Sequence, residues 1–136
     1  MKESALKAGK SIWNSLPVLA GIILLISLAN TVIPKSSYSV LFNKFPLLDS
    51  IIGSIIGSIL AGNPINSYII GGELLNQGVS LIAVTSFIVA WVSVGIIQLP
   101  AESMLLGKKF AIIRNIVSFI LSIIVAFVTV IILGLL

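Results

Sequence analysis

Few residues of this 136-residue sequence could do chemistry, and they form no familiar catalytic set. The sequence has no Cys and no His, which excludes disulfides, zinc–thiolate and iron–sulfur centres, His-ligated haem and a Ser-His-Asp triad. The acidic residues are Glu3, Asp49, Glu73 and Glu102. A single Asp also excludes an intramembrane aspartyl protease, which needs a pair. We therefore expect a protein that is not an enzyme and that uses no metal and no cofactor.

The polar residues with the strongest functional pattern lie in the stretch Gly62-Asn63-Pro64-Ile65-Asn66-Ser67-Tyr68. Pro64 lacks an N–H and disfavours helix at the residue before it, so the stretch predicts a break between two helices. A helix that starts near Pro64 would present unpaired N–H groups and partial positive charge to an anion or a substrate oxygen. We predict a substrate-binding site made of Asn63, Pro64, Asn66, Ser67, Tyr68 and the span-end amide Gln98. The alternative is a hairpin tip whose polar groups satisfy one another.

Two carboxylates beside apolar segments, Glu73 and Glu102, are the candidate proton-coupling groups. An ionised carboxylate deep in a bilayer costs a few kcal/mol, so it needs a partner or a function. Glu73 follows two glycines, and Glu102 is close in sequence to Lys108, Lys109 and Arg114. The alternative for each acid is an interfacial position or an ion pair.

The composition indicates that these residues belong to an integral membrane protein. Hydrophobic residues make up 58% of the chain and charged residues 9%, with a mean hydropathy of +1.23, whereas soluble domains are about 45–50% apolar and about 25% charged. Three stretches, roughly 13–33, 79–99 and 111–136, are long enough to span a bilayer core. The net charge of +4 is explained by topology signals and lipid-headgroup contacts, and nucleic acid is not an expected partner.

A further apolar region, residues 47–75, is divided at Gly62-Asn63-Pro64 into two pieces that each reach about halfway across a core of about 30 Å. If this region crosses as one broken helix, three basic residues lie on one side of the membrane and five on the other. If it is a re-entrant hairpin, six basic residues lie on one side and two on the other. Only the second count obeys the positive-inside rule. We therefore predict an all-α membrane protein in the plasma membrane, with three transmembrane helices, a broken or re-entrant helical hairpin and a cytoplasmic N-terminus. The alternative is four spans with the second helix broken.

Small residues recur at helical spacing in three of these segments and predict helix–helix packing, because lipid provides no hydrophobic drive for association. They are Gly53, Gly57 and Ala61 in the first half of the divided region, Ser86, Ala90 and Ser93 in the third apolar stretch, and Ser118 and Ser122 in the last. Such seams need partner helices. Three crossings and one hairpin also bury too little to enclose a pathway, so we expect a homodimer or a higher homo-oligomer.

Residues 53–106 resemble the predicted permease family that includes the ArsP/YraQ-type organoarsenical exporters. The resemblance lies in Gly57, Gly62-Asn63-Pro64, Gly71-Gly72-Glu73 and Gln98-Leu99-Pro100-Ala101-Glu102. It implies that the chain, as a single membrane domain over residues 1–136, corresponds to one half of a larger permease. Relatives thought to handle arsenicals use cysteine, which is missing here, so thiolate capture of a metalloid is not implied. The nucleoside-recognition, or gate, domain of transporters is a weaker match.

Taken together, these features predict a small permease that acts as a homodimer in the lipid bilayer. It would move a small solute or ion, with anions among the candidates, by alternating access. A passive channel and a non-transporting assembly subunit of a larger membrane complex are the alternatives.

Overall fold

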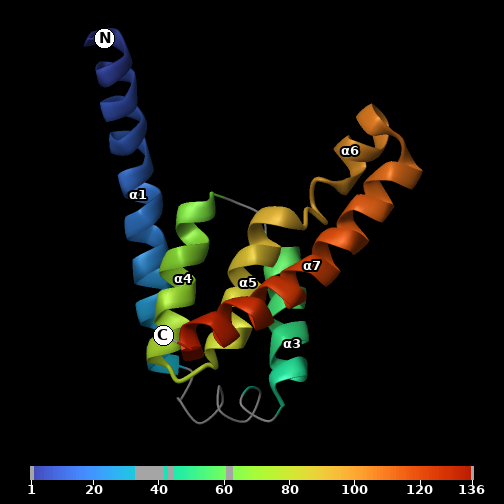
Figure 1. Ribbon diagram of the computed structural model, residues 1–136. Helices are drawn as coiled ribbons and strands as arrows, with labels where there is room; N and C mark the ends of the chain where they lie inside the picture. The colour runs from blue at the N-terminus through green and yellow to red at the C-terminus, as the bar shows by residue number, and fades with distance from the viewer. Residues whose placement is uncertain (1, 33–41, 43–44, 61–62, 136) are drawn as a thin grey trace. The chain divides into compact units, whose positions relative to one another are not determined.

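The computed structural model describes residues 2–32, 42, 45–60 and 63–135, and every element in them is a helix. The elements are α1 (Lys2–Val32), α3 (Pro46–Ile59), α4 (Pro64–Asn76), α5 (Leu81–Ser93), α6 (Leu99–Leu106) and α7 (Lys108–Leu135) (Figure 1). The all-α prediction is confirmed for these residues. The chain forms two compact units, residues 1–34 and residues 35–136.

The first unit consists of α1. This helix has 31 residues and continues through Pro17 without a break. At about 1.5 Å per residue it is about 46 Å long. The first predicted span, 13–33, lies inside α1 except for its last residue, which is outside the described part.

The second unit is built around α5. Helices α3, α4 and α7 each pack against α5, α3 also contacts α7, and α6 packs against α7 (Figure 1). The side chains of Val84, Phe87 and Ala90 are almost completely buried in α5. The position of α5 explains its uniformly apolar sequence, because a helix that is covered on several sides needs no polar face.

Helices α3 and α5 run in the same direction in close contact. At their first residues, Ser80 Oγ donates to Asp49 Oδ2 at 2.5 Å. Further along, a Cβ on Gly53 would lie 2.2 Å from the carbonyl oxygen of Ala83, and a Cβ on Gly57 would lie 2.3 Å from that of Phe87. The paired residues stay 30 or 31 positions apart along both helices. With this register α3 begins about five residues before α5 and ends about four residues before it, so Leu60 lies level with Ala90 and Val94 lies about 6 Å further along.

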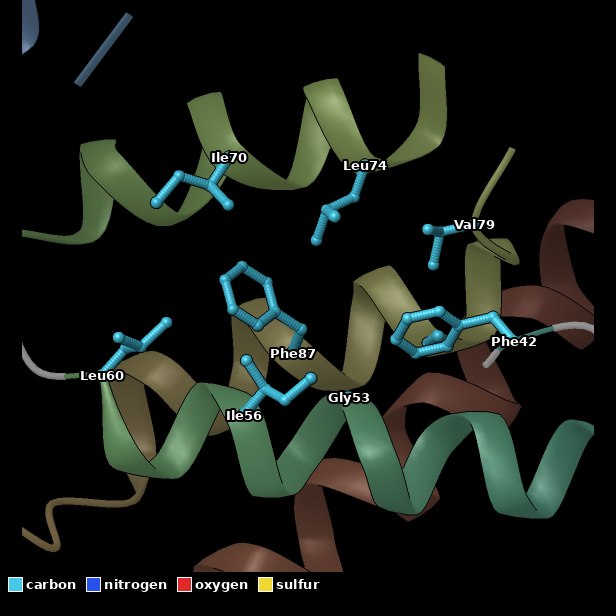
Figure 2. A pocket seen from close by; sticks show the side chains of 9 residues that line it. Phe42, Gly53, Ile56, Leu60, Ile70, Leu74, Val79 and Phe87 are labelled. Carbon is cyan, nitrogen blue, oxygen red and sulfur yellow. The ribbon is translucent and has the colours of Figure 1, made fainter. Parts of the chain in front are cut away.

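Helix α4 runs in the opposite direction to α3, so the chain reverses between them (Figures 1 and 2). The two helices have 14 and 13 residues, which makes each about 20 Å long. They pack on α5 rather than on each other. This reversal is the geometry of a hairpin and not of a single broken rod.

The third apolar stretch is not one helix. Helix α5 ends at Ser93, Val94 has extended backbone, and α6 begins at Leu99 with Pro100 in its first turn. The expected span 79–99 is therefore divided, and the short helix α6 follows the division. The break has a tertiary cause, because the N–H of Gly95 donates to Asn115 Oδ1 of α7 instead of continuing the helix. We call the interruption between Leu60 and Asn63 the first break and residues 94–98 the second break.

Helix α7 is the longest element of the second unit. Among the described residues, Lys108–Gly134 is the one segment that satisfies the length and composition of a membrane span, with a mean hydropathy of 3.1. Helices α3 and α5 are apolar but shorter. The three-span prediction therefore has direct support from α7 alone.

Helices α3 and α7 bury small and polar residues and expose large aliphatic ones. On α3, the buried residues are Asp49, Ser50, Gly53, Ser54, Gly57 and Ser58. The exposed side chains of the same helix include Leu47, Leu48, Ile55 and Ile59. On α7, Ala111, Asn115, Ser122 and Ala126 are buried, whereas Ile112, Ile116, Ile120 and Ile124 are exposed. This distribution is opposite to that of a water-soluble bundle.

Candidate functional site

At the first break, the start of α4 is capped by Asn63. Asn63 precedes α4, and its Oδ1 accepts a hydrogen bond from the N–H of Ile65 at 3.0 Å. The N–H of Asn66 donates to the carbonyl oxygen of Asn63 at 2.9 Å, and Pro64 has no N–H to offer. The expectation that this helix end presents free N–H groups is therefore wrong for Ile65 and Asn66, because the Asn63 cap already uses them.

The other predicted substrate-binding residues point to different places. Ser67 is fully buried and its hydroxyl donates to the carbonyl oxygen of Pro64 at 2.7 Å. Tyr68 is 62% exposed, and Asn66 is half-buried. Gln98 is exposed at the start of α6, next to the second break. The predicted residues thus form one polar turn at the start of α4, with Gln98 on a separate element.

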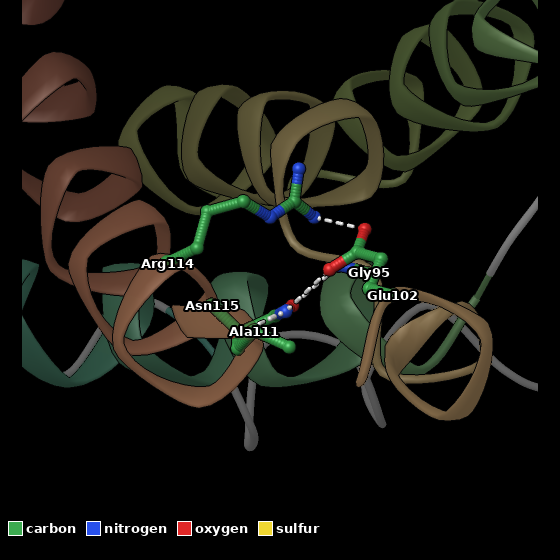
Figure 3. A network of polar contacts seen from close by, with 5 residues as sticks. All are labelled: Gly95, Glu102, Ala111, Arg114 and Asn115. Carbon is green, nitrogen blue, oxygen red and sulfur yellow. Dashed lines mark hydrogen bonds and ion pairs between the residues drawn. The ribbon is translucent and has the colours of Figure 1, made fainter. Parts of the chain in front are cut away.

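A polar network holds the second break (Figure 3). The centre of this network is Asn115 of α7, which is buried. Its Oδ1 accepts from the N–H of Gly95 at 2.8 Å, and its Nδ2 donates to Glu102 Oε2 at 3.2 Å and to the carbonyl oxygen of Ala111 at 2.9 Å. One side chain therefore joins the end of α5, the helix α6 and the helix α7.

Glu102 forms an ion pair with a basic side chain. Arg114 Nη2 lies 2.6 Å from Glu102 Oε1, and the two side chains are 37% and 16% exposed. Both carboxylate oxygens of Glu102 therefore have a donor, one from Arg114 and one from Asn115. Arg114 Nε is buried and has no hydrogen-bond partner among the described residues. The arrangement is the ion-pair alternative for Glu102, with Arg114 rather than Lys108 or Lys109 as the partner.

Glu73 lies far from this network. It is in the last turn of α4, where its Oε1 accepts a hydrogen bond from Gln77 Nε2 at 2.9 Å. Because α4 is antiparallel to α5 and α6 follows α5, the two predicted proton-coupling residues lie at opposite ends of the second unit (Figure 1). Glu73 and Glu102 therefore do not form one relay.

The predicted packing residues make their contacts within the chain. Gly53 and Gly57 lie against α5 as described above, and Ser54 Oγ is 2.9 Å from Ser122 Oγ, joining α3 to α7. The predicted packing residues that are fully buried are Ser86, Ala90 and Ser122, and those that are half-buried are Ser93 and Ser118. Ala61 lies outside the described residues. These seams face one another inside one copy, so they do not by themselves require a second copy.

Sequence reasoning missed two buried polar residues. Asp49 closes the base of the α3–α4 hairpin through Ser80, and Asn115 organises the second break. A signal for both was present in the sequence. Asp49 is the single Asp of the chain, and Asn115 is an amide inside the apolar stretch 111–136. An isolated polar residue in such a stretch is usually paired inside the protein.

An apolar chamber separates α3 from α4 (Figure 2). Its volume is about 210 Å³, and the residues that line it are Phe42, Gly53, Ile56, Leu60, Ile70, Leu74, Val79, Ala83 and Phe87. None of the predicted substrate-binding residues belongs to this set. If nothing filled this space, its lining side chains would lack partner atoms on one side and lose their dispersion contacts.

Comparisons of the chain with protein-family models, with curated proteins and with solved structures found no match. The permease resemblance therefore stays a hypothesis drawn from the sequence motifs.

Proposed function

We propose that this chain is a multi-pass membrane protein that works as a small permease. Its apolar exterior supports the membrane setting. Large aliphatic side chains are exposed along α3 and α7, while serines, Asp49 and Asn115 are buried and hydrogen-bonded. Helices that pack in lipid have this arrangement, because small and polar residues join the helices and aliphatic residues meet the acyl chains. In the proposed topology α1, α5–α6 and α7 cross the bilayer.

In this topology α3 and α4 form a re-entrant hairpin. Each helix is about 20 Å long, which is shorter than a hydrocarbon core of about 30 Å. The Asp49–Ser80 hydrogen bond joins the start of α3 to the start of α5, where α4 also ends. The hairpin would then enter and leave on one side, with its tip inside the bilayer. The six-to-two distribution of basic residues gives the same topology.

The observation that carries the transport proposal is the pair of helix breaks near the same end of α3 and α5, about 6 Å apart along the helix axes. Helices α3 and α5 run in the same direction. Each is followed by an extended residue, Leu60 or Val94, whose N–H donates a hydrogen bond to a carbonyl oxygen in the last turn of the helix. Broken backbone at membrane depth is tolerated where protein buries it or where it lines a water-filled cavity. We infer that the solute passes beside the two breaks, with Asn63, Asn66 and Tyr68 as contacts.

Glu102 is the proton-coupling group of this proposal. When it is ionised, it holds Arg114 and is held by Asn115. Protonation would remove the charge that attracts Arg114 and leave the guanidinium to attract an anionic solute. The same change would act on the second break, because Asn115 also holds Gly95. A second copy of the chain would complete the pathway.

Single cysteines test the topology cleanly, because the chain has none. We expect Phe45→Cys and Asn76→Cys, at the two ends of the hairpin, to react with an impermeant maleimide from outside intact cells. Lys108→Cys should react only after the cells are opened. Labelling of Phe45→Cys and Asn76→Cys from opposite sides would replace the hairpin with a broken crossing helix.

Transport is tested with the purified full chain in proteoliposomes. A thermal-shift screen of anions, nucleosides and metalloid oxyanions first identifies a solute, and its uptake is then measured with and without a proton gradient. We expect Asn63→Ala to lower uptake about tenfold and Glu102→Gln to abolish the effect of the gradient. Asn76→Ala, which changes an exposed Asn at the other end of α4, is the matched control. Wild-type uptake in both test variants would refute the site.

One observation favours the assembly-subunit alternative. Helix α6 has no buried residue, and Met104 and Leu105 are 88% and 84% exposed at its end. Such a helix offers an apolar surface to a larger membrane partner. Co-purification of one partner in a fixed ratio, with no uptake by the chain alone, would favour this function. Uptake that neither saturates nor depends on a counter-ion would instead indicate a passive channel.

A further inference from the structure

The apolar chamber between α3 and α4 cannot close without disrupting the helix packing on both of its sides. On one side, Gly53 and Gly57 hold α3 against backbone carbonyls of α5. On the other side, a Cβ on Gly71 of α4 would lie 2.8 Å from Ile88 Cδ1 of α5. Both arms of the hairpin are therefore held on α5, and the width of α5 keeps them apart.

The side chains around the chamber make it unsuitable for water. Figure 2 shows Ile56 and Leu60 of α3, Ile70 and Leu74 of α4, and Phe87 of α5 directed into the space between the ribbons. Each lining residue is apolar. A buried water needs two to four polar partners, and an apolar cavity without them stays dry and takes up apolar molecules.

The rim of the chamber leads to an apolar surface. Ile56 and Leu60 line the chamber and are also exposed, and the neighbouring Ile59 and Leu75 are exposed without lining it. A molecule that enters from this rim has to pass large aliphatic side chains. In the membrane setting of the proposed function, the molecule present at such a rim is a lipid acyl chain.

We propose that the chamber binds one hydrocarbon chain of a bilayer lipid, which holds the two arms of the hairpin apart. The inference rests on the proposed membrane setting and not on transport. Binding is driven by transfer of methylene groups into a site that excludes water. The lipid is a structural part of the hairpin, and its loss would leave a void that the glycine contacts prevent from collapsing.

Trp91 can report occupancy of the chamber. Its ring makes an edge contact with Phe87, with centroids 5.5 Å apart, and Phe87 lines the chamber. Trp91 is only 9% exposed, so lipid outside the protein has little access to it. The chain has one other tryptophan, Trp13 in α1, and Trp13→Phe therefore leaves Trp91 as the single tryptophan.

The test measures fluorescence quenching in nanodiscs that contain phospholipid brominated in mid-chain. We expect the double variant Ile56→Phe and Leu74→Phe, which fills the chamber in the Trp13→Phe background, to lose at least half of the quenching. The matched control is Ile59→Phe and Leu75→Phe, which adds the same rings to the exposed sides and should leave quenching unchanged. Leu74→Phe alone, with circular dichroism of each protein, serves if the double variant does not fold.

Three results would overturn the proposal. Equal quenching in the filled and control variants would mean that no acyl chain occupies the chamber. Quenching that depends on the chamber with free bromobenzene, but not with brominated lipid, would make the occupant a small solute. Failure of the chain to enter nanodiscs at all would contradict the membrane setting, and the lipid site with it. Equal quenching in a nanodisc-embedded protein contradicts the lipid site alone and leaves the transport proposal to its own test.

Discussion

The two breaks of the second unit have the same outline and different causes. In both, a helix ends in an extended residue and the next helix begins with Pro in its first turn. The first break is held by a residue inside it, because Asn63 caps α4. The second break is held by Asn115, which lies 20 residues from Gly95 in another helix. One break is local and the other is tertiary.

This difference has an energetic consequence. A cap exchanges one hydrogen bond at an exposed helix end, where water in the proposed solute pathway can replace the lost acceptor. A buried N–H that loses its acceptor has no such replacement, and it costs more to leave unsatisfied. We therefore expect the second break to be far more sensitive to substitution than the first.

The largest effect is expected for Asn115→Leu. This change removes the acceptor of the Gly95 N–H and one donor to Glu102, and each buried unsatisfied group costs about 1–3 kcal/mol. We expect a loss of about 3 kcal/mol in the free energy of unfolding, measured in mixed micelles by circular dichroism, together with faster amide exchange at Gly95. Asn76→Leu on the exposed end of α4 is the control. A loss no greater than that of the control would mean that Asn115 does not hold the second break.

The next effect concerns the close contact between α3 and α5. Gly57→Ala would place a Cβ 2.3 Å from the carbonyl oxygen of Phe87, so α3 and α5 would have to separate. Overpacking of this kind costs about 1–3 kcal/mol, and we expect about 2 kcal/mol in the same unfolding assay. Gly72→Ala meets nothing within 4 Å and should instead stabilise α4 by up to about 1 kcal/mol. Equal shifts in the two alanine variants would contradict the close packing of α3 on α5.

The same contrast explains how far the sequence could predict this fold. The reversal at the first break was predictable, because Asn63 and Pro64 act on their own backbone and leave a signal in the local sequence. The glycines of α3 likewise indicated close helix packing through their spacing. In each case the cause and the effect lie within a few residues.

The second break left no such signal. Residues 94–97 are Val-Gly-Ile-Ile, which continue the apolar pattern of α5, so periodicity predicts an unbroken span. The end of the helix depends on an amide supplied by α7. The chamber was unpredictable for a related reason, because it depends on the distance between α3 and α4 when both are seated on α5. The prediction of free N–H groups at the start of α4 was wrong because it left out the cap that Asn63 supplies.

A smaller effect is expected for the ion pair beside the second break. Glu102→Gln keeps an acceptor for Asn115 and loses the charge that pairs with Arg114. Hydrogen bonds to charged groups contribute about 1.5–3 kcal/mol, and the partial exposure of Arg114 lowers this to about 1 kcal/mol through solvent screening. A double-mutant cycle with Arg114→Gln measures the coupling between the two side chains. No coupling in low salt would show that Asn115 holds α6 without the ion pair.

The smallest effect is expected at the first break. Asn63→Ala removes the cap of α4, which typically costs about 1 kcal/mol, and Asn63→Ser should recover most of that loss because Ser is as good a cap. The free energy of unfolding of both variants is measured in the same assay as that of Asn115→Leu. The ratio of the losses compares the stability of the two breaks. If Asn63→Ala cost as much free energy of unfolding as Asn115→Leu, the Asn63 side chain would do more than cap α4. It would then have a buried partner at the hairpin tip, as a second copy of the chain at that tip would provide, and both breaks would be tertiary.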